Sequence, residues 1–234
     1  MRTFLRLNGL VLGMLMLFTG SCPNMELVQV VSIAPIDNPV FAETGGTAAA
    51  IPAFPGAEGF GANSVGGRGG RVIEVINLND SGPGSLRAAI EAEGSRIVIF
   101  RTGGTIELQS GLNIHNPFIT IAGQTAPGGG ITLRHDPSRN TGVSLGIWTH
   151  DVIVRYLGVR PGPSIEESCC VDGVSIQGGH DIILDHVSAS WAVDENVNSW
   201  YDPHDFTIQW SIISEGLYNS THEQGPHSLS LIHI

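Results

Sequence analysis

Short runs of β-branched and other apolar residues follow one another from Phe54 onward, and glycine-rich turns separate them. β-Branched and aromatic residues favour extended backbone, whereas glycine favours turns. The pattern therefore predicts a protein built from many short strands. The predicted strands occupy residues 71–76, 96–100, 118–122, 130–133, 152–156, 173–176, 182–184 and 206–210.

One stretch departs from the strand pattern and predicts a helix over residues 86–93. Ser85 precedes this stretch, and serine is a favoured N-cap residue. Gly94 follows it, and glycine suits the C′ position after a helix. One face of the predicted helix is apolar and carries Leu86, Ala89 and Ile90.

A His-Asp pair recurs before three of the apolar runs, at intervals of 30 and 24 residues. Repeats that enter their strands at the same phase indicate stacked structural units. Because no helices lie between these strands and the spacing varies, we expect a parallel β-helix with coils about 4.8 Å apart. We interpret the helix over 86–93 as a cap on the open end of the stack, and the His-Asp pairs as groups of the turns that hydrogen-bond from coil to coil. The pairs are His150-Asp151, His180-Asp181 and His204-Asp205.

The composition is acidic, with a formal net charge of −11 and no lysine among the 11 basic residues. Such a chain offers no basic patch for nucleic acid. An acidic protein can still bind an acidic polymer when divalent cations bridge the two. The charge therefore directs attention to oxygen-rich cation sites.

Residues 1–22 resemble an export signal, because two arginines precede a short apolar run and small residues follow it. The apolar run is too short to predict a membrane span. Cys22 offers an alternative, a lipid anchor at the outer cell surface, and a cut after Ala42 is a second alternative. We assign residues 23–52 to a linker and residues 53–234 to the folded domain, and we expect a secreted monomer.

Asp172 and Asp194 are 22 residues apart, which is about one coil of the predicted β-helix. If the two residues stack on neighbouring coils, their carboxylates can both reach one Ca²⁺, whose oxygen ligands lie about 2.3–2.6 Å away. Glu195 and Asn198 would add further oxygens, and oxygen-only ligation favours Ca²⁺ over zinc. The alternative is that Asp172 caps a turn and Asp194 is simply solvated.

Other polar or aromatic groups have structural interpretations. Asp185 and His186 follow a buried strand, where the carboxylate would hold the imidazole in the turn. The glycine-rich residues 66–70 lack the ending of a phosphate loop and precede a strand rather than a helix. The tryptophans would stack on sugar rings or fill the core, and we expect Trp210 to be a core residue. The other three are Trp148, Trp191 and Trp200.

Several motifs resemble those of secreted bacterial pectate lyases of polysaccharide lyase family one, over about residues 53–231. The resemblance implies an all-β fold, a right-handed parallel β-helix with a short N-terminal capping helix. It further implies calcium-dependent cleavage of polygalacturonate, an acidic polysaccharide, by β-elimination. In that reaction calcium binds the uronate carboxylate, an arginine removes the C5 proton, and the C4–O bond breaks. The motifs lie at residues 54–62, 77–87, 119–128, 182–186, 190–195 and 207–215.

The resemblance carries over to the candidate calcium ligands. Asp172 matches a calcium aspartate of the family, Asp194 takes the place of a calcium-binding glutamate, and Asn198 stands where a further aspartate is common. An aspartate expected just before Asp172 is missing, and either Glu166 or Glu167 would have to compensate. Cys169 and Cys170 lie at that place, and because adjacent cysteines are seldom bridged, we expect no disulfide framework.

The resemblance also bears on substrate contacts and on the catalytic base. His222, Gln224 and His227 lie in a stretch that resembles the family motif His-x-Lys-Gly-x-His-Ser, with Gln224 in place of the lysine. The family's base arginine is expected beyond Ile234, so no catalytic residue is assigned. We therefore expect a β-helix that is incomplete at its C-terminus, with little lyase activity of its own.

Two further functional hypotheses remain open from the sequence. A non-catalytic β-helix could bind pectin-like glycans at the cell surface, which the missing lysine favours. A glycoside hydrolase on the same fold would use paired carboxylates near a water molecule. The products separate the three hypotheses: unsaturated uronides for a lyase, saturated sugars for a hydrolase, and none for a binding protein.

Overall fold

The structure, a computed structural model, describes residues 6–7, 10–11, 51–139, 141–163, 165, 170–226 and 229–233. The chain forms two compact units, Met1–Thr47 and Ala48–Ile234. In the first unit, β1 (Arg6–Leu7) pairs antiparallel with β2 (Leu10–Val11). Apart from residues 6–7, 10–11 and 51–52, the predicted export signal and linker lie outside the described residues, and both stay predictions. In the described part of the chain, no helix has the length and apolar character that crossing a bilayer requires.

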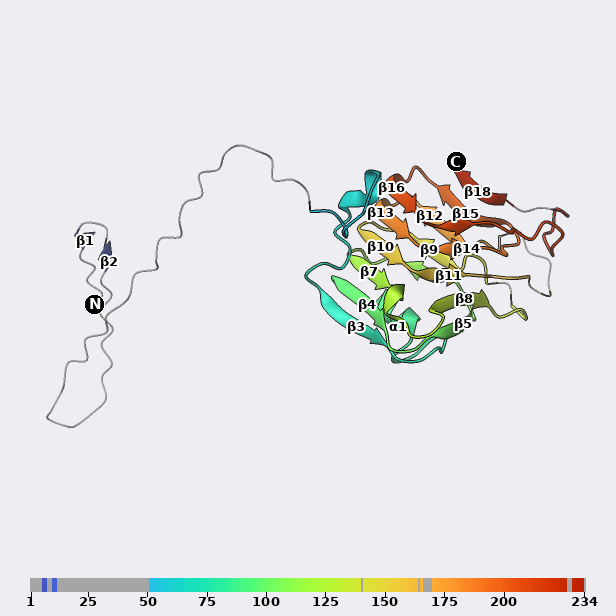
Figure 1. Ribbon diagram of the computed structural model, residues 1–234, viewed down its shortest axis with the longest axis horizontal. Helices are drawn as coiled ribbons and strands as arrows, with labels where there is room; N and C mark the ends of the chain where they lie inside the picture. Colours follow the sequence, from blue (N-terminus) through green and yellow to red (C-terminus); the bar gives the residue numbers. More distant parts are fainter. Residues whose placement is uncertain are drawn as a thin grey trace. The chain divides into compact units, whose positions relative to one another are not determined.

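The second unit is a parallel β-helix made of three sheets, as the sequence predicts (Figure 1). The first sheet contains β3 (Arg71–Val75), β4 (Arg96–Phe100), β7 (Ile119–Ala122), β10 (Val152–Arg155), β13 (His180–Asp185) and β16 (His204–Gln209). The second contains β5 (Gly104–Leu108), β8 (Ile131–His135), β11 (Leu157–Val159), β14 (Ser188–Ala189) and β17 (Ile212–Ile213). The third contains β6 (Leu112–Ile114), β9 (Leu145–Ile147), β12 (Val174–Gln177), β15 (Glu195–Trp200) and β18 (Leu229–His233).

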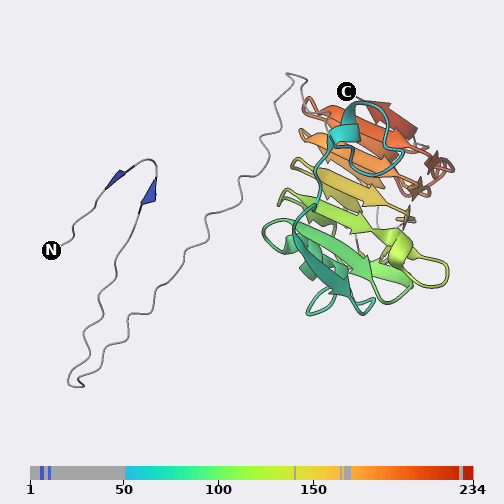
Figure 2. The same cartoon turned by 60° about the vertical axis from the view of Figure 1, so that its left-hand side comes forward.

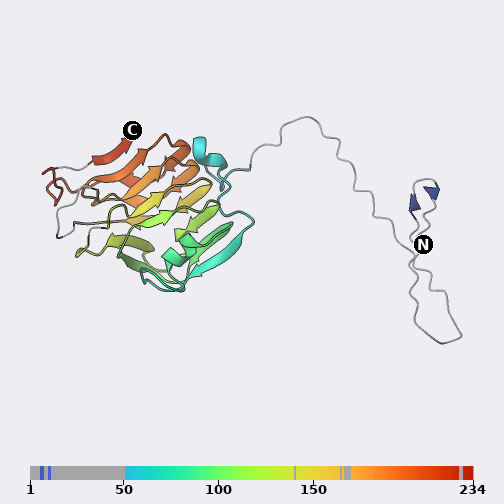
Figure 3. The same cartoon turned by 180° about the vertical axis from the view of Figure 1, so that it is seen from behind.

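Each coil contributes one strand to every sheet, so that β4, β5 and β6 are followed by β7, β8 and β9, and so on to β18 (Figure 3). Matching apolar residues stack from coil to coil. Val152 lies opposite Ile182 and Val154 opposite Leu184, and all four side chains are buried. Burying one such side chain stabilises the fold by about 1.5–3 kcal/mol. The apolar residues of the repeated strand pattern therefore form the interior of the β-helix.

The predicted capping helix is present as α1 (Leu86–Glu91), whose N-cap Ser85 accepts a hydrogen bond from Ala88 N. Its apolar face is buried against β3, β4 and β6, the first strands of the stack. The helix ends two residues earlier than predicted, so Gly94 is not its C′ residue. Arg96, which is fully buried, donates to the last helical carbonyls instead, with Nε 3.0 Å from Ala89 O.

The three His-Asp pairs form a ladder along one corner of the β-helix. Each imidazole Nδ1 lies close to the carboxylate of the following aspartate, at 2.8 Å, 2.7 Å and 3.0 Å along the chain. The rings of His150 and His180 stack at 4.9 Å, and those of His180 and His204 at 5.1 Å. The side-chain hydrogen bonds therefore run within each pair rather than from coil to coil as predicted, and ring stacking makes the contact between coils.

An N-terminal strap, residues 53–70 with the short helix η1 (Phe60–Asn63), crosses the outer face of the first sheet before the chain enters β3 (Figure 2). Its backbone amides donate to side chains of well-separated coils: Gly61 N to Thr207 Oγ1 on β16 at 2.9 Å, and Gly67 N to Thr120 Oγ1 on β7 at 2.9 Å. A Cβ atom on Gly61 would lie 2.0 Å from Ile182 O. The glycines therefore serve close backbone approach, in agreement with the rejection of a phosphate loop.

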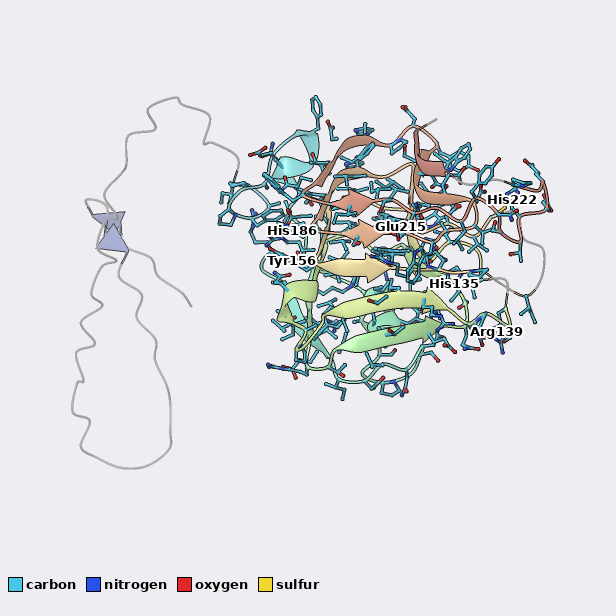
Figure 4. All side chains as sticks on the ribbon, turned by 45° about the vertical axis from the view of Figure 1, so that its right-hand side comes forward. His135, Arg139, Tyr156, His186, Glu215 and His222 are labelled. Atoms are coloured by element: carbon cyan, nitrogen blue, oxygen red, sulfur yellow. The ribbon has the colours of Figure 1, made fainter. Side chains whose placement is uncertain are left out.

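Asp185 and His186 have the structural role predicted for them. The carboxylate of Asp185, 1% exposed, accepts hydrogen bonds from Arg155 Nε at 2.7 Å and from Gln209 Nε2 at 2.8 Å. His186 Nδ1 lies 3.0 Å from the same carboxylate, and its ring stacks on Tyr156 at 4.4 Å (Figure 4). Burial alone would raise the pKa of Asp185, but the hydrogen bonds from Gln209, Arg155 and His186 outweigh it and lower the pKa.

Candidate metal centre

Asp172 and Glu195 stand beside each other at the start of neighbouring strands of the third sheet. β12 and β15 pair in parallel with Val174 opposite Val197, and the same register continued by two residues places Asp172 opposite Glu195. Glu195 N donates to Asp172 Oδ1 at 3.3 Å. One carboxylate oxygen from each of Asp172, Asp194 and Glu195 lies within 4.8 Å of the others. These three predicted residues therefore form one carboxylate cluster.

Asn198, the fourth predicted ligand, joins two of these carboxylates. Its Nδ2 donates to Asp172 Oδ2 at 2.9 Å and to Glu195 Oε2 at 3.2 Å. The residue is 1% exposed, and its Oδ1 has no hydrogen-bond partner within the described structure. A buried carbonyl oxygen without a partner costs free energy. A bound cation would give this oxygen the partner that it lacks.

The electrostatics of the cluster favour either a proton or a cation. Burial raises the pKa of Asp172 to about 7; the hydrogen bond from Asn198 opposes this rise, and the charge of Glu195 adds to it. Burial, followed by the charge of Asp194, also raises the pKa of Glu195. Buried carboxylates this close together are costly when all are ionised and uncompensated. A cation that binds here therefore displaces a proton.

His222 packs against the third carboxylate of the cluster. Its Nε2 lies 3.7 Å from Asp194 Oδ1, and the residue is 5% exposed. Gln224 N donates to His222 Nδ1 at 3.1 Å, so the neutral imidazole carries its hydrogen on Nε2, the atom that faces Asp194. Because His222 is buried beside a carboxylate, the structure groups it with the cluster. The predicted contact between His222 and a polymer stays a prediction.

The remaining predicted site residues lie either in an exposed turn or outside the described residues. Gln224 is exposed in the turn that follows His222. His227, Glu166 and Glu167 lie outside the described residues. Cys170 is disulfide-bonded, so the expectation of no disulfide was wrong, and the other cysteines of the chain also lie outside the described residues.

Three of the four tryptophans are about half exposed or more, including Trp210, which was predicted to lie in the core. Trp210 is 71% exposed, so its assignment to the core was wrong. The strand that precedes it, β16, ends at Gln209, and Trp210 itself has a φ of 50°, which turns its side chain out at a corner of the coil. Trp148 and Trp191 are about half exposed, at 46% and 47%.

Sequence reasoning missed two buried polar residues behind Asp172. Ser144 precedes β9, and His135 ends β8. Polar residues flank most of the strands in this chain, so neither position differs from its neighbours in the sequence. Figure 4 shows His135 on the same side of the β-helix as His222, away from Tyr156 and His186.

Comparison with known proteins adds to this picture. No family model matches the chain. A protein of Emericella nidulans named "Probable pectate lyase C" is 47% identical over 176 residues, which cover 75% of this chain and 39% of that protein. The protein of the same name from Aspergillus flavus is 48% identical over the same shares. "Probable pectate lyase 18" of Solanum lycopersicum is 33% identical over 64% of this chain and 40% of its own length.

Among solved structures, the chain is similar to jun a 1, the major allergen from cedar pollen, with a TM-score of 0.51 and 21% identity. The similarity covers 64% of this chain and 46% of that one, and it supports the fold. The fold and the buried carboxylate cluster thus define a parallel β-helix protein with a candidate cation site. Over the 176 matched residues, the chain is similar to these proteins named as probable pectate lyases, and it spans 39% of the length of these curated relatives.

Proposed function

We propose that this chain forms the calcium-binding part of a pectate lyase, an enzyme that cleaves polygalacturonate by β-elimination. The observation that carries the proposal is the buried cluster of Asp172, Asp194 and Glu195 next to the unpartnered Oδ1 of Asn198. All the candidate ligand atoms are oxygens, which suits Ca²⁺ better than zinc. The names of the relatives supply the substrate class.

Bound calcium would supply positive charge that neutralises a uronate carboxylate and makes its C5 proton more acidic. The chain's own residues would hold that charge in place. Asp172 and Glu195 would bind as carboxylates after releasing the proton that their burial favours, and Asn198 would add Oδ1. His222 would help to keep Asp194 in place by packing against its carboxylate, with Nε2 3.7 Å from Oδ1. Removal of the C5 proton is not assigned to any residue of this chain.

The geometry disfavours a glycoside hydrolase. The two carboxyl groups of such enzymes flank the scissile bond, about 5–5.5 Å apart in retaining enzymes and about 6.5–9.5 Å apart in inverting ones, where a water must also fit. Here one oxygen from each of the three carboxylates lies within 4.8 Å of the others, and two of the three residues are buried. Such a cluster suits an ion better than an anomeric carbon.

A second candidate function is calcium-dependent binding of acidic glycans without cleavage. The exposed turn residue Gln224 favours it, because the motif that this stretch resembles has a lysine there and this chain has none. For either function we infer export directed by residues 1–22, an acidic polysaccharide as the partner, and a monomeric protein.

Calorimetric titration of the chain with Ca²⁺, followed by cosedimentation with polygalacturonate, tests the proposal. We expect Ca²⁺ binding, retention on the polymer that a chelator reverses, and loss of both in Asp172→Asn. Failure of the wild-type chain to bind Ca²⁺ would refute the proposed site. Ultraviolet absorbance of unsaturated uronides then separates the functions: product supports the lyase, and retention without product supports the binding protein.

A further inference from the structure

The main-chain carbonyl of Asp172 is held by Ser144 of the preceding coil. Ser144 N donates to Asp172 O at 2.9 Å, and Ser144 Oγ lies 3.1 Å from the same oxygen. Ser144 is fully buried, at 0% exposed. Two donors from one residue therefore converge on the backbone of a proposed calcium ligand.

A buried histidine stands behind this serine. His135 Nε2 lies 2.8 Å from Ser144 Oγ, and His135 is 3% exposed at the end of β8. Burial lowers the pKa of His135 to about 4, so the ring is neutral at neutral pH. His135 makes no described contact with a carboxylate of the cluster, so it would act on Asp172 only through Ser144.

The three contacts that join His135, Ser144 and Asp172 can all be hydrogen bonds in only one arrangement of the hydrogens. A serine hydroxyl has a single hydrogen. When Ser144 donates that hydrogen to Asp172 O, the contact with His135 requires Nε2–H to donate to Ser144 Oγ. A neutral imidazole carries one N–H, so this arrangement fixes the Nε2–H tautomer.

We propose that His135 and Ser144 are positioning residues for the cation site. His135 Nε2–H donates to Ser144 Oγ, and Ser144 Oγ–H donates to Asp172 O. This relay of two hydrogen bonds fixes the backbone from which the Asp172 carboxylate projects toward Glu195. The inference rests on the proposed function of Asp172 as a calcium ligand. Groups that orient metal ligands from behind typically change metal affinity about 10–100-fold when mutated. The relay therefore sets affinity without touching the ion.

The first test measures Ca²⁺ affinity by calorimetry in the full chain and in serine variants. We expect Ser144→Ala to weaken binding roughly 10-fold and Ser144→Thr, which keeps the hydroxyl, to restore most of the affinity. Ser64→Ala is the matched control, because Ser64 is also 0% exposed but its Oγ has no described partner and it lies in the strap. We expect this control to bind Ca²⁺ like the wild-type chain.

Equal affinities of the wild-type chain and Ser144→Ala would overturn this inference and leave the proposed function intact. Absence of Ca²⁺ binding by the wild-type chain would overturn both. A second measurement does not depend on the folding of any variant. Nitrogen NMR of the wild-type imidazoles should show His135 as the Nε2–H tautomer, and a hydrogen on Nδ1 instead would overturn the relay.

Discussion

Arg155 and Asp185 form an ion pair across neighbouring coils, with Nε 2.7 Å from Oδ2, and the ring of Phe54 covers the guanidinium at 3.8 Å. The pair joins β10 to β13, and Phe54 ties the N-terminal strap to both. Gln209, which lies on the next coil, donates a hydrogen bond to the same carboxylate. One buried aspartate therefore connects three coils and the strap.

Asp185→Asn should destabilise the fold by on the order of 2–3 kcal/mol, because Arg155 would keep its charge without a carboxylate partner. The free energy of unfolding from urea titration measures this loss. Glu74→Gln is the control: Glu74 pairs with Arg101 on the surface, where the two side chains are 45% and 62% exposed. We expect little or no change from this control. Equal effects of both substitutions would contradict the role given to Asp185.

Gly61→Ala should loosen the strap, because the new Cβ would lie 2.0 Å from Ile182 O, a backbone atom that cannot move aside. Overpacking of this kind costs about 1–3 kcal/mol. Gly129 offers a matched control, since a Cβ there meets nothing within 4 Å. Thermal unfolding of both variants should show a lower midpoint for Gly61→Ala alone. An unchanged midpoint would mean that the strap contributes little to stability.

Without a divalent cation, the contribution of Asp172 to the free energy of unfolding should fall as the pH rises from about 4 to about 7. Burial raises the pKa of Asp172 from 3.8 to about 7 in the folded chain. In that interval the folded state keeps a proton that the unfolded state has lost, so stability falls by at most about 1.4 kcal/mol per pH unit for this group. Urea titrations of the wild-type chain and of Asp172→Asn across this range isolate this slope, because buried His135, with its pKa lowered to about 4, contributes with the opposite sign.

Asp172→Asn should remove this contribution, because the amide does not titrate. Ca²⁺ should reverse it, since a ligand present at 100 times its dissociation constant stabilises the folded state by about 2.7 kcal/mol. The stabilisation by Ca²⁺ should be larger at pH 7 than at pH 5, where protons compete with the ion. A Ca²⁺ effect independent of pH would contradict the assignment of Asp172.

Asn198→Asp should lower the stability of the chain without a cation but raise its affinity for Ca²⁺. The new carboxylate removes the amide that donates to Asp172 and Glu195 and adds a like charge, so the chain without cation should be less stable. The same carboxylate should strengthen Ca²⁺ binding by roughly 10-fold or more, because Ca²⁺ affinity rises with the charge of its ligands. Calorimetry and urea titration measure the two effects. Weaker Ca²⁺ binding would show that Asn198 does not face the ion.

The fold was predictable because its repeat is local: apolar runs and His-Asp pairs recur at intervals that suit coils. The site was predictable only in part. The spacing of 22 residues paired Asp172 with Asp194, whereas the register of β12 and β15 places Glu195 opposite Asp172, one residue further along. Turn length decides this register, and no propensity rule fixes turn length. Trp210 was misjudged for a related reason, since its left-handed backbone at a corner interrupts the alternation of the strand.

Contacts between distant segments were beyond prediction. The strap meets β13 and β16 across more than 100 residues of sequence, and its glycines suggested only turns. The approach of His222 to Asp194 and of His135 to Ser144 also depends on which loops meet after the coils have stacked.

The route of the strap has a mechanical consequence. In a solenoid each coil normally contacts only its neighbours, so an end can unravel while the rest stays folded. Here the chain leads from residue 56 to the late strand β16 before it runs back to β3, with Gly56 O bonded to Gln209 and Gly67 N to Thr120. A pull on the amino-terminal side of the β-helix would therefore load the coil of β16 first, and the earliest coils would feel the tension last.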